Sequence, residues 1–385
     1  MLNKIREYFD TCDFDIRKTK NARFFDQKVQ PDVLSAVCEC ILNCTENNSA
    51  FTVNDIRYCP YSNELVTEIF NKPDIKKAEN EYDKFFAQPL KMLAYSGLLK
   101  ESKKGRTNEY SILNKNFIEY ISLRDRNAYF FLSMYIEKVL RDSGIWEYFD
   151  TFFSTQTKES LYVLRGQYVG FIQQYTAIKK DFEPIRILNP LLRTLAFKLK
   201  KLGSKDGDVA EINYDDLLYN KPNWRDIKKD KAITRVEFNA AFQHNIDNGR
   251  FYEYQIEKAK KFVKALHKNS EIHDFDAYPA TQAHHIFSKS EFPELADMPE
   301  NIIALTPNQH FYRAHPDNKT SILDKTYQVI CLISKLDSVE VDYRFGTNNY
   351  SKDSFIDVVN TGLGTSFNYT VDFEELKHSI VKFFL

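Results

Sequence analysis

Long apolar runs are missing from this sequence of 385 residues. No stretch reaches the roughly 18 consecutive apolar residues that a membrane-spanning helix needs. The first residues, which include Lys4, Arg6 and Glu7, do not form the apolar segment of a secretory signal peptide. We therefore expect a soluble protein of the cytoplasm that has no membrane partner.

Paired metal-binding cysteines are also missing. The six cysteines form no Cys-x-x-Cys pair, so the sequence offers no zinc knuckle. Cys40 and Cys44 have the spacing at which two side chains share a helix face, but free thiols in a reducing compartment are the expectation for all six. The segment from Asp206 to Asp216 is rich in Asp and Asn, yet it lacks the spacing of a calcium loop.

An overall excess of basic charge is missing too, since the formal net charge is −1. The charges are nevertheless unevenly distributed. Residues 221–268 contain 12 Lys and Arg against 6 Asp and Glu, whereas residues 271–385 contain 9 against 17. This asymmetry fits a protein whose contacts with nucleic acid are confined to particular faces, although a solvated helix surface explains any single basic run equally well.

The chain does have core material and length for several domains. Hydrophobic residues make up 43% of it, with 31 Phe and 23 Tyr, and 385 residues exceed what one core normally supports. We expect a mostly helical α+β protein with domains at residues 1–115, 116–270 and 271–385. The middle domain is predicted to be helical throughout, with aromatic runs such as Tyr129 to Leu132 in its core.

The first domain combines helices with a hairpin. Apolar spacing predicts a helix from Asp32 to about Asn43, and Thr52 has the residue type and place to cap a short helix. A longer helix is predicted from about Ala78 to Gly97. Two candidate strands follow, and the polar segment 102–108 joins them. The order of elements is therefore three helices and then a hairpin with a basic tip.

This order resembles a winged helix-turn-helix over about residues 31–115. The resemblance implies that the third helix, which contains Lys91, enters the major groove of DNA. It also implies that the hairpin, or wing, brings Lys103, Lys104 and Arg106 to the DNA backbone or minor groove. Winged helices serve as protein-docking modules as well, so a protein partner stays open.

The most informative stretch lies in the last domain. It runs through His284 and His285, then Asn301, then Thr306 and His310. The pattern predicts two short strands and a helix that Thr306 caps and a proline begins. Sixteen positions separate His285 from Asn301, and nine separate Asn301 from His310. Such a fold would gather a proton acceptor and metal ligands at one point, as phosphodiester hydrolysis requires.

This stretch resembles the HNH (ββα-metal) nucleases, in the variant that opens with two adjacent histidines, over about residues 271–320. The resemblance implies that His285 is the general base that activates water. It implies that His284 and His310 hold the metal ion, and that Asn301 ties down the loop between the strands and holds the base in register.

Other residues of the stretch are candidates for supporting roles. Arg313, three residues after His310, shares its helix face and is a candidate phosphate contact. His315 follows His310 by five residues, where the family usually has a ligand at four, so it is turned away from that face unless the helix ends early. Carboxylates that orient the histidine rings are expected, and Asp274, Asp276 and Glu300 are the candidates.

The combination of a DNA-binding module and this nuclease motif resembles a bacterial restriction endonuclease. It implies cleavage of double-stranded DNA at a specific sequence, with one divalent metal ion per site and products that carry a 5′-phosphate and a 3′-hydroxyl. The ion would be Mg²⁺ or a transition metal such as Mn²⁺, Co²⁺ or Ni²⁺, and a homodimer is expected during cleavage. A modification-dependent or homing-type HNH nuclease, and a non-catalytic winged-helix regulator, stay open as alternatives.

Overall fold

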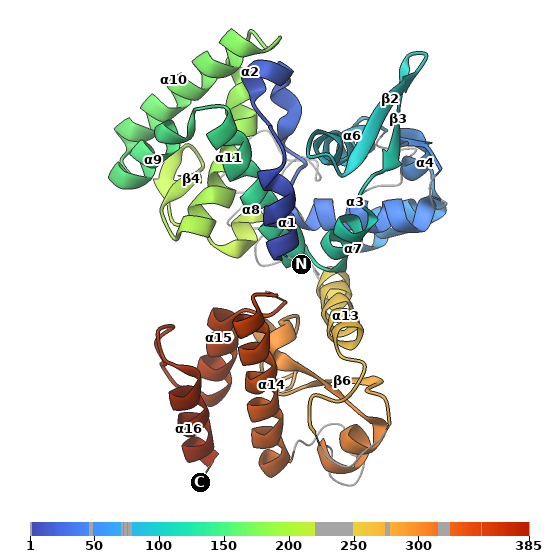
Figure 1. The fold of residues 1–385 in the computed structure, drawn as a ribbon, viewed down its shortest axis with the longest axis vertical. Coiled ribbons are helices and arrows are strands. Elements are labelled where there is room, and N and C mark those ends of the chain that lie inside the picture. Colours follow the sequence, from blue (N-terminus) through green and yellow to red (C-terminus); the bar gives the residue numbers. More distant parts are fainter. Residues whose placement is uncertain are drawn as a thin grey trace, which may run out of the picture. The chain divides into compact units, whose positions relative to one another are not determined.

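The computed structural model describes residues 2–45, 49–70, 72, 75, 79–219, 249–273, 278–314, 324–347 and 349–384. The chain divides into two compact units. The N-terminal unit is Lys4–Asn248, and the C-terminal unit is Gly249–Leu385 together with Met1–Asn3. The described residues are mostly helical, with three small sheets, as the sequence predicts for its fold class (Figure 1).

The first part of the N-terminal unit contains short helices, one long helix and a three-stranded antiparallel sheet. The sheet has the strand order β1-β3-β2, and Figure 1 shows β2 and β3 as a hairpin that extends beyond the helices. The elements are α1 (Leu2–Asp10), α2 (Ile16–Thr19), α3 (Pro31–Cys44), β1 (Phe51–Thr52), α4 (Val53–Arg57), α5 (Pro60–Glu64), a π-helical turn (Leu65–Ile69), α6 (Glu79–Tyr95), β2 (Leu99–Lys104) and β3 (Thr107–Ile112).

Local sequence explains several of these boundaries. The Thr52 hydroxyl accepts from the Asp55 N–H at 3.3 Å and the Asp55 carboxylate accepts from the Thr52 N–H at 2.7 Å, so the predicted cap of α4 is a reciprocal capping box. The hairpin turns at Gly105 and Arg106, and Gly105 has a φ of +63°, which glycine adopts at little cost. The turn is therefore shorter than the predicted polar tip. Helix α6 continues through Pro89.

The second part of this unit is a group of helices, α7 (Lys115–Leu123), α8 (Asp125–Asp142), α9 (Trp146–Thr155), α10 (Lys158–Tyr175) and α11 (Phe182–Leu199). Tyr129 and Phe131 of α8 are buried, as expected. The prediction that this region is helical throughout is wrong at β4 (Gly203–Lys205) and β5 (Asp208–Ala210), which form an antiparallel hairpin. The turn consists of Asp206 and Gly207, both with positive φ, and this pair is a typical hairpin turn.

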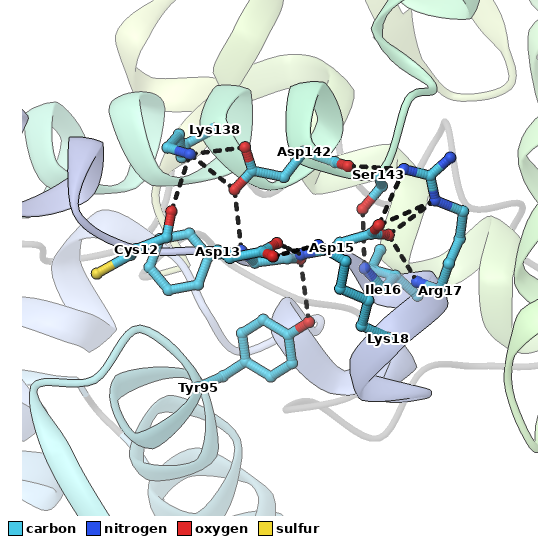
Figure 2. Close-up of polar contacts among 11 residues, drawn as sticks. Cys12, Asp13, Asp15, Ile16, Arg17, Lys18, Tyr95, Lys138, Asp142 and Ser143 are labelled. Carbon is cyan, nitrogen blue, oxygen red and sulfur yellow. Dashed lines mark hydrogen bonds and ion pairs between the residues drawn. The ribbon is translucent and has the colours of Figure 1, made fainter.

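The N-terminal arm joins these two parts of the unit. Figure 2 shows residues 12–18 lying along the end of α8. The Asp142 carboxylate accepts from the Phe14 N–H at 2.9 Å, and the Ser143 hydroxyl accepts from the Ile16 N–H at 3.0 Å. The Tyr95 hydroxyl, at the end of α6, donates to the Phe14 carbonyl at 3.3 Å. The arm therefore holds the end of α6 close to the end of α8.

One expectation about the cysteines is wrong. Cys44 and Cys59 form a disulfide, with their Cα atoms 6.0 Å apart, whereas free thiols were expected. The pair escaped prediction because Cys44 ends α3 and Cys59 precedes α5, so only the turn of the chain between two helices brings them together. Cys12, Cys38, Cys40 and Cys331 form no disulfide.

The C-terminal unit packs a two-stranded sheet against helices. Its elements are α13 (Gly249–Leu266), β6 (Gln282–His285), β7 (Ile302–Leu305), a π-helical turn (Gln309–Ala314), α14 (Lys325–Phe345), α15 (Lys352–Leu363) and α16 (Phe373–Phe384). Three-residue 3₁₀ turns stand at Pro293–Leu295 and Pro299–Asn301. All four residues of β7 are buried, so this strand is the centre of the unit's core.

The two units differ from the three expected segments. The expected boundary between residues 115 and 116 falls inside α7, whose side chains pack on α3 and α8. Helix α13, expected in the middle domain, packs on β6 and β7 of the C-terminal unit. No helix in the described parts of the chain is both long and apolar enough to cross a membrane.

Candidate active site

Strands β6 and β7 carry the histidine pair. They are antiparallel, with His284 opposite Ile303 and His285 opposite Ile302. Ile302 and Ile303 are fully buried, so hydrophobic burial fixes the register of the short ribbon. His284 is 5% exposed and His285 is half-buried. The predicted strand, turn and strand are therefore present, and both histidines stand at the end of β6.

One nitrogen of the His285 ring is hydrogen-bonded to a backbone carbonyl. His285 Nε2 lies 2.9 Å from the Ala296 oxygen. Because a carbonyl only accepts, Nε2 must carry the proton, and Nδ1 of the neutral ring then has its lone pair available. Burial lowers the pKa of His285, and the charges of Lys260 and Lys289 act in the same direction, while the bond to Ala296 opposes them. A neutral ring at pH 7 has the protonation state of a general base.

The Asn301 side chain joins the two ends of the segment between the strands. It is fully buried, and its Oδ1 accepts from the Phe287 N–H at 2.9 Å. Its Nδ2 donates to the carbonyls of Phe287 at 3.0 Å and Leu295 at 3.1 Å. The segment that these bonds close contains Ala296, whose carbonyl holds His285. Asn301 therefore makes contacts of the kind expected for a residue that fixes the base.

The helix that carries His310 begins where the sequence predicts. The Thr306 hydroxyl accepts from the Gln309 N–H at 3.2 Å, and the Gln309 side-chain oxygen accepts from the Thr306 N–H at 3.0 Å. This is a capping box immediately before Pro307. The His310 N–H donates to the Thr306 carbonyl at 3.0 Å, so His310 lies in the first turn.

Two imidazole rings from different elements face each other in this unit. The ring centroids of His284 and His310 are 5.4 Å apart, in an edge-to-face arrangement. Two imidazoles that bind one ion at about 2.1 Å from nitrogen have centroids roughly 5 Å apart, so the observed separation fits a shared metal ion. Among the described residues, no three His, Cys, Asp or Glu side chains form a metal-binding group. Within that part of the chain the pair is a partial ligand set.

The other sequence candidates are placed as follows. Arg313 is exposed in the π-helical turn after His310. The Glu300 carboxylate is 3% exposed and accepts from the Ser351 N–H at 2.9 Å, which assigns it a role in the core. His315, Asp274 and Asp276 lie outside the described residues.

A buried polar network lies behind β7, and sequence reasoning missed it. The Glu271 carboxylate accepts from the Ala304 N–H at 2.8 Å and from Lys335 Nζ at 2.7 Å, and both side chains of this ion pair are fully buried. Lys335 also donates to the Tyr350 hydroxyl at 2.9 Å. Burial lowers the pKa of Lys335, and the Glu271 charge opposes this shift. Glu271 is far from Lys335 and Tyr350 in the sequence, so no local sequence pattern predicts the network.

The predicted DNA contacts belong to the N-terminal unit. Lys103, Lys104 and Arg106 are all exposed at the tip of the β2–β3 hairpin. Lys104 also forms an ion pair with Glu109 at 3.3 Å. Lys91 of α6 differs from them, since its Nζ is 2.5 Å from the Glu101 carboxylate on β2 and its side chain is 34% exposed. Lys91 thus braces the helix against the hairpin.

The structure also places charged residues near His285 that the sequence did not single out. Lys260 and Glu257 of α13, and Lys289 after β6, all act electrostatically on the His285 ring. Sequence reasoning noted the basic stretch 221–268 as a whole, but had no signal that distinguishes these residues. Of that stretch, residues 221–248 lie outside the described part of the chain.

Comparisons with known proteins add no relative to this picture. No protein-family model matches the chain, and no curated protein or solved structure matches it significantly.

Proposed function

We propose that the protein is a metal-dependent DNA endonuclease of the HNH type. The observation that carries this proposal is the combined geometry of four residues. His285 Nε2 is hydrogen-bonded to the Ala296 carbonyl, and Asn301 closes the loop that contains this carbonyl. The rings of His284 and His310 face each other. A proton acceptor fixed beside two metal-ligating rings is the minimum equipment for metal-assisted phosphodiester hydrolysis.

Each residue of the candidate site has a separate role in the proposed reaction. His285 Nδ1 takes the proton from a water molecule, because Nε2 is bound to Ala296. The proton leaves the water as its oxygen attacks the phosphorus and the bond between the phosphorus and the 3′ oxygen breaks. The departing 3′ oxygen takes up a proton from solvent, so the products carry a 5′-phosphate and a 3′-hydroxyl. His284 and His310 would hold one divalent ion, which supplies charge stabilisation at the phosphate when bound. Arg313 would contact a phosphate.

The N-terminal unit supports a DNA-binding role. The elements α3, β1, α4, α6, β2 and β3, with sheet order β1-β3-β2, resemble a winged helix that has α5 and a π-helical turn added between α4 and α6. The exposed cations at the hairpin tip would supply charges for phosphate contacts. We accordingly propose double-stranded DNA as substrate, cleavage at a specific site as in restriction endonucleases, a homodimer during cleavage and a cytoplasmic location.

A plasmid nicking assay tests the nuclease proposal. Supercoiled plasmid is incubated with wild type and with His285→Ala, each with Mn²⁺ or Mg²⁺ and each with EDTA. Wild type should convert the plasmid to nicked and linear forms only with metal, and His285→Ala should be slower by roughly 10² to 10⁴-fold. The affinity of His285→Ala for a DNA duplex should equal that of wild type, since His285 has no proposed role in DNA binding.

The outcomes also separate the alternatives. A winged-helix regulator would bind DNA without cutting it under any condition. A modification-dependent nuclease would cut methylated plasmid but spare an unmodified one. A variant that cuts at more than about a tenth of the wild-type rate would remove His285 from the role of base.

A further inference from the structure

Helix α13 lies beside the candidate site and presents a charged row to solvent. Its buried face, which includes Ile256, Phe262 and Val263, packs on β6 and β7. Glu253, Glu257, Lys260 and Lys264 recur at spacings of four, three and four residues, so they share one face of the helix, on which Lys260 is only partly exposed. The same strands that carry His284 and His285 therefore hold this charged row in place.

Two lysines, one on α13 and one on the loop after β6, are held by glutamates of this row. Lys260 Nζ is 2.9 Å from Glu257, and their side chains are 27% and 57% exposed. Lys289, on the loop after β6, is 2.6 Å from Glu253, and their side chains are 44% and 53% exposed. The charges of Lys260 and Lys289 both reach the His285 ring. The two cations thus come from different elements, α13 and the loop that directly follows the strand carrying His285.

Ion pairs as exposed as these contribute little to stability. A phosphate can therefore replace either carboxylate at small cost. Nucleic acid brings a dense row of phosphates, and its binding gains from each lysine that displaces a counterion. The two lysines contribute little to stability through their ion pairs and lie in the unit that carries the proposed nuclease site. Binding of the DNA backbone therefore explains them better than a structural role does.

We propose that Lys260 and Lys289 form a phosphate-binding edge that holds the DNA backbone beside His285, and that Glu257 and Glu253 hold these two lysines in place before DNA binds. The proposal rests on the proposed function, because it takes His285 as the place of cleavage. It adds a second DNA-binding surface, in the C-terminal unit, to the hairpin tip of the N-terminal unit.

The test measures duplex binding by the full chain as a function of salt. Fluorescence anisotropy with a labelled 30-base-pair duplex, in EDTA so that nothing is cut, gives the slope of log K against log KCl. The double variant Lys260→Gln/Lys289→Gln should reduce the absolute slope of log K against log KCl by roughly 1.8, since each phosphate contact contributes about 0.9 to this slope. Near 0.1 M salt its affinity should fall by about tenfold per lysine.

A matched control removes two paired cations elsewhere in the same unit. Lys377 pairs with Asp337 at 2.7 Å, and Arg344 pairs with Glu340. The variant Lys377→Gln/Arg344→Gln changes the net charge equally and should leave the slope as in wild type. Conversely, Glu253→Gln/Glu257→Gln frees the two lysines and should tighten binding.

The salt slope of duplex binding and the plasmid nicking assay test two separate proposals, so either proposal can fail without the other. If wild type cuts plasmid and the slope of Lys260→Gln/Lys289→Gln equals that of wild type, the phosphate-binding edge is overturned and the nuclease stands. If the slope falls as expected but wild type never cuts, the surface stands and the nuclease falls. Equal losses in the control variant, or no duplex binding by wild type, would also overturn the edge.

Discussion

At the residue scale, the chemistry of the candidate site depends on having two imidazoles where most HNH sites have an imidazole and a carboxylate. Imidazole favours transition metals, whereas Mg²⁺ prefers hard oxygen ligands and releases water reluctantly. With His284 and His310, whose ring centroids are 5.4 Å apart, as the proposed metal ligands, we predict that Mn²⁺, Co²⁺ or Ni²⁺ supports cleavage at lower concentrations than Mg²⁺. Metal titrations of the nicking rate measure this order directly.

The variant His284→Asp sharpens this prediction. A carboxylate at this position should shift the preference toward Mg²⁺ without moving the cut position, which sequencing of the product ends checks. Mg²⁺ active at the lowest concentration in wild type would mean that an oxygen ligand already completes the site. Asp274 and Asp276 would then be the first candidates.

A second residue, His267, makes stability depend on pH. Its Nε2 is 2.8 Å from the Tyr350 hydroxyl. Burial lowers its pKa from 6.5, and the nearby Glu271 charge opposes the shift without reversing it. The unfolded chain therefore binds a proton at a pH where the folded chain does not. The resulting stability is fully present above pH 6.5 and is lost as pH falls toward the pKa of the folded state.

Denaturant unfolding at pH 7.5 and 5.5 checks this expectation. Wild type should lose more stability between the two values than His267→Gln, in which the amide can still bond to Tyr350 but does not titrate. Other acidic and basic groups titrate equally in both proteins, so the difference between them isolates His267. An equal loss in both proteins would assign the pH dependence to other groups.

At the element scale, the β2–β3 hairpin is the proposed DNA contact of the N-terminal unit. Lys103, Lys104 and Arg106 are exposed at its tip. Replacing all three with Ala should weaken duplex binding and reduce the salt slope by up to about 2.7, or about 0.9 for each lost phosphate contact. The β2–β3 ladder keeps its backbone bonds, so the fold should be unaffected.

The control removes three exposed lysines from other elements of the same unit, Lys4, Lys158 and Lys180. Their loss should change the slope much less than loss of the hairpin cations. If the hairpin variant binds with the wild-type slope, the winged-helix-like part docks a protein instead, and α13 becomes the leading DNA contact.

Elements were predictable from the sequence where local rules set them. Thr306 with Gln309, and Thr52 with Asp55, start helices through bonds made within four residues, so the sequence alone predicted both helix starts. The β4–β5 hairpin carries its own signal, Asp206-Gly207, but only three residues on each side pair, too few to show an alternating pattern. Contacts between distant segments, such as Glu271 with Lys335, have no such local signal.

At the scale of the whole molecule, the proposed cutting site and the hairpin cations belong to different units. The overall charge of −1 gives no sign of the proposed DNA partner, because it sums over both units. The hairpin tip and α13 each have a local group of cations, and acidic residues on the same elements and in other parts of the chain cancel their sum. Binding through two surfaces should therefore depend steeply on salt although the molecule is nearly neutral.

The last prediction concerns the assembly that cuts both strands. One HNH-type site cuts one strand at a time, so a double-strand break by a homodimer needs two active chains. We predict that mixing wild type with an excess of His285→Ala yields nicked plasmid at the expense of linear plasmid, because mixed dimers contain one working base. Sedimentation with the duplex bound should show two chains. If the inactive chain only dilutes the activity and leaves the ratio of nicked to linear product unchanged, each chain acts alone and the break arises from successive independent nicks.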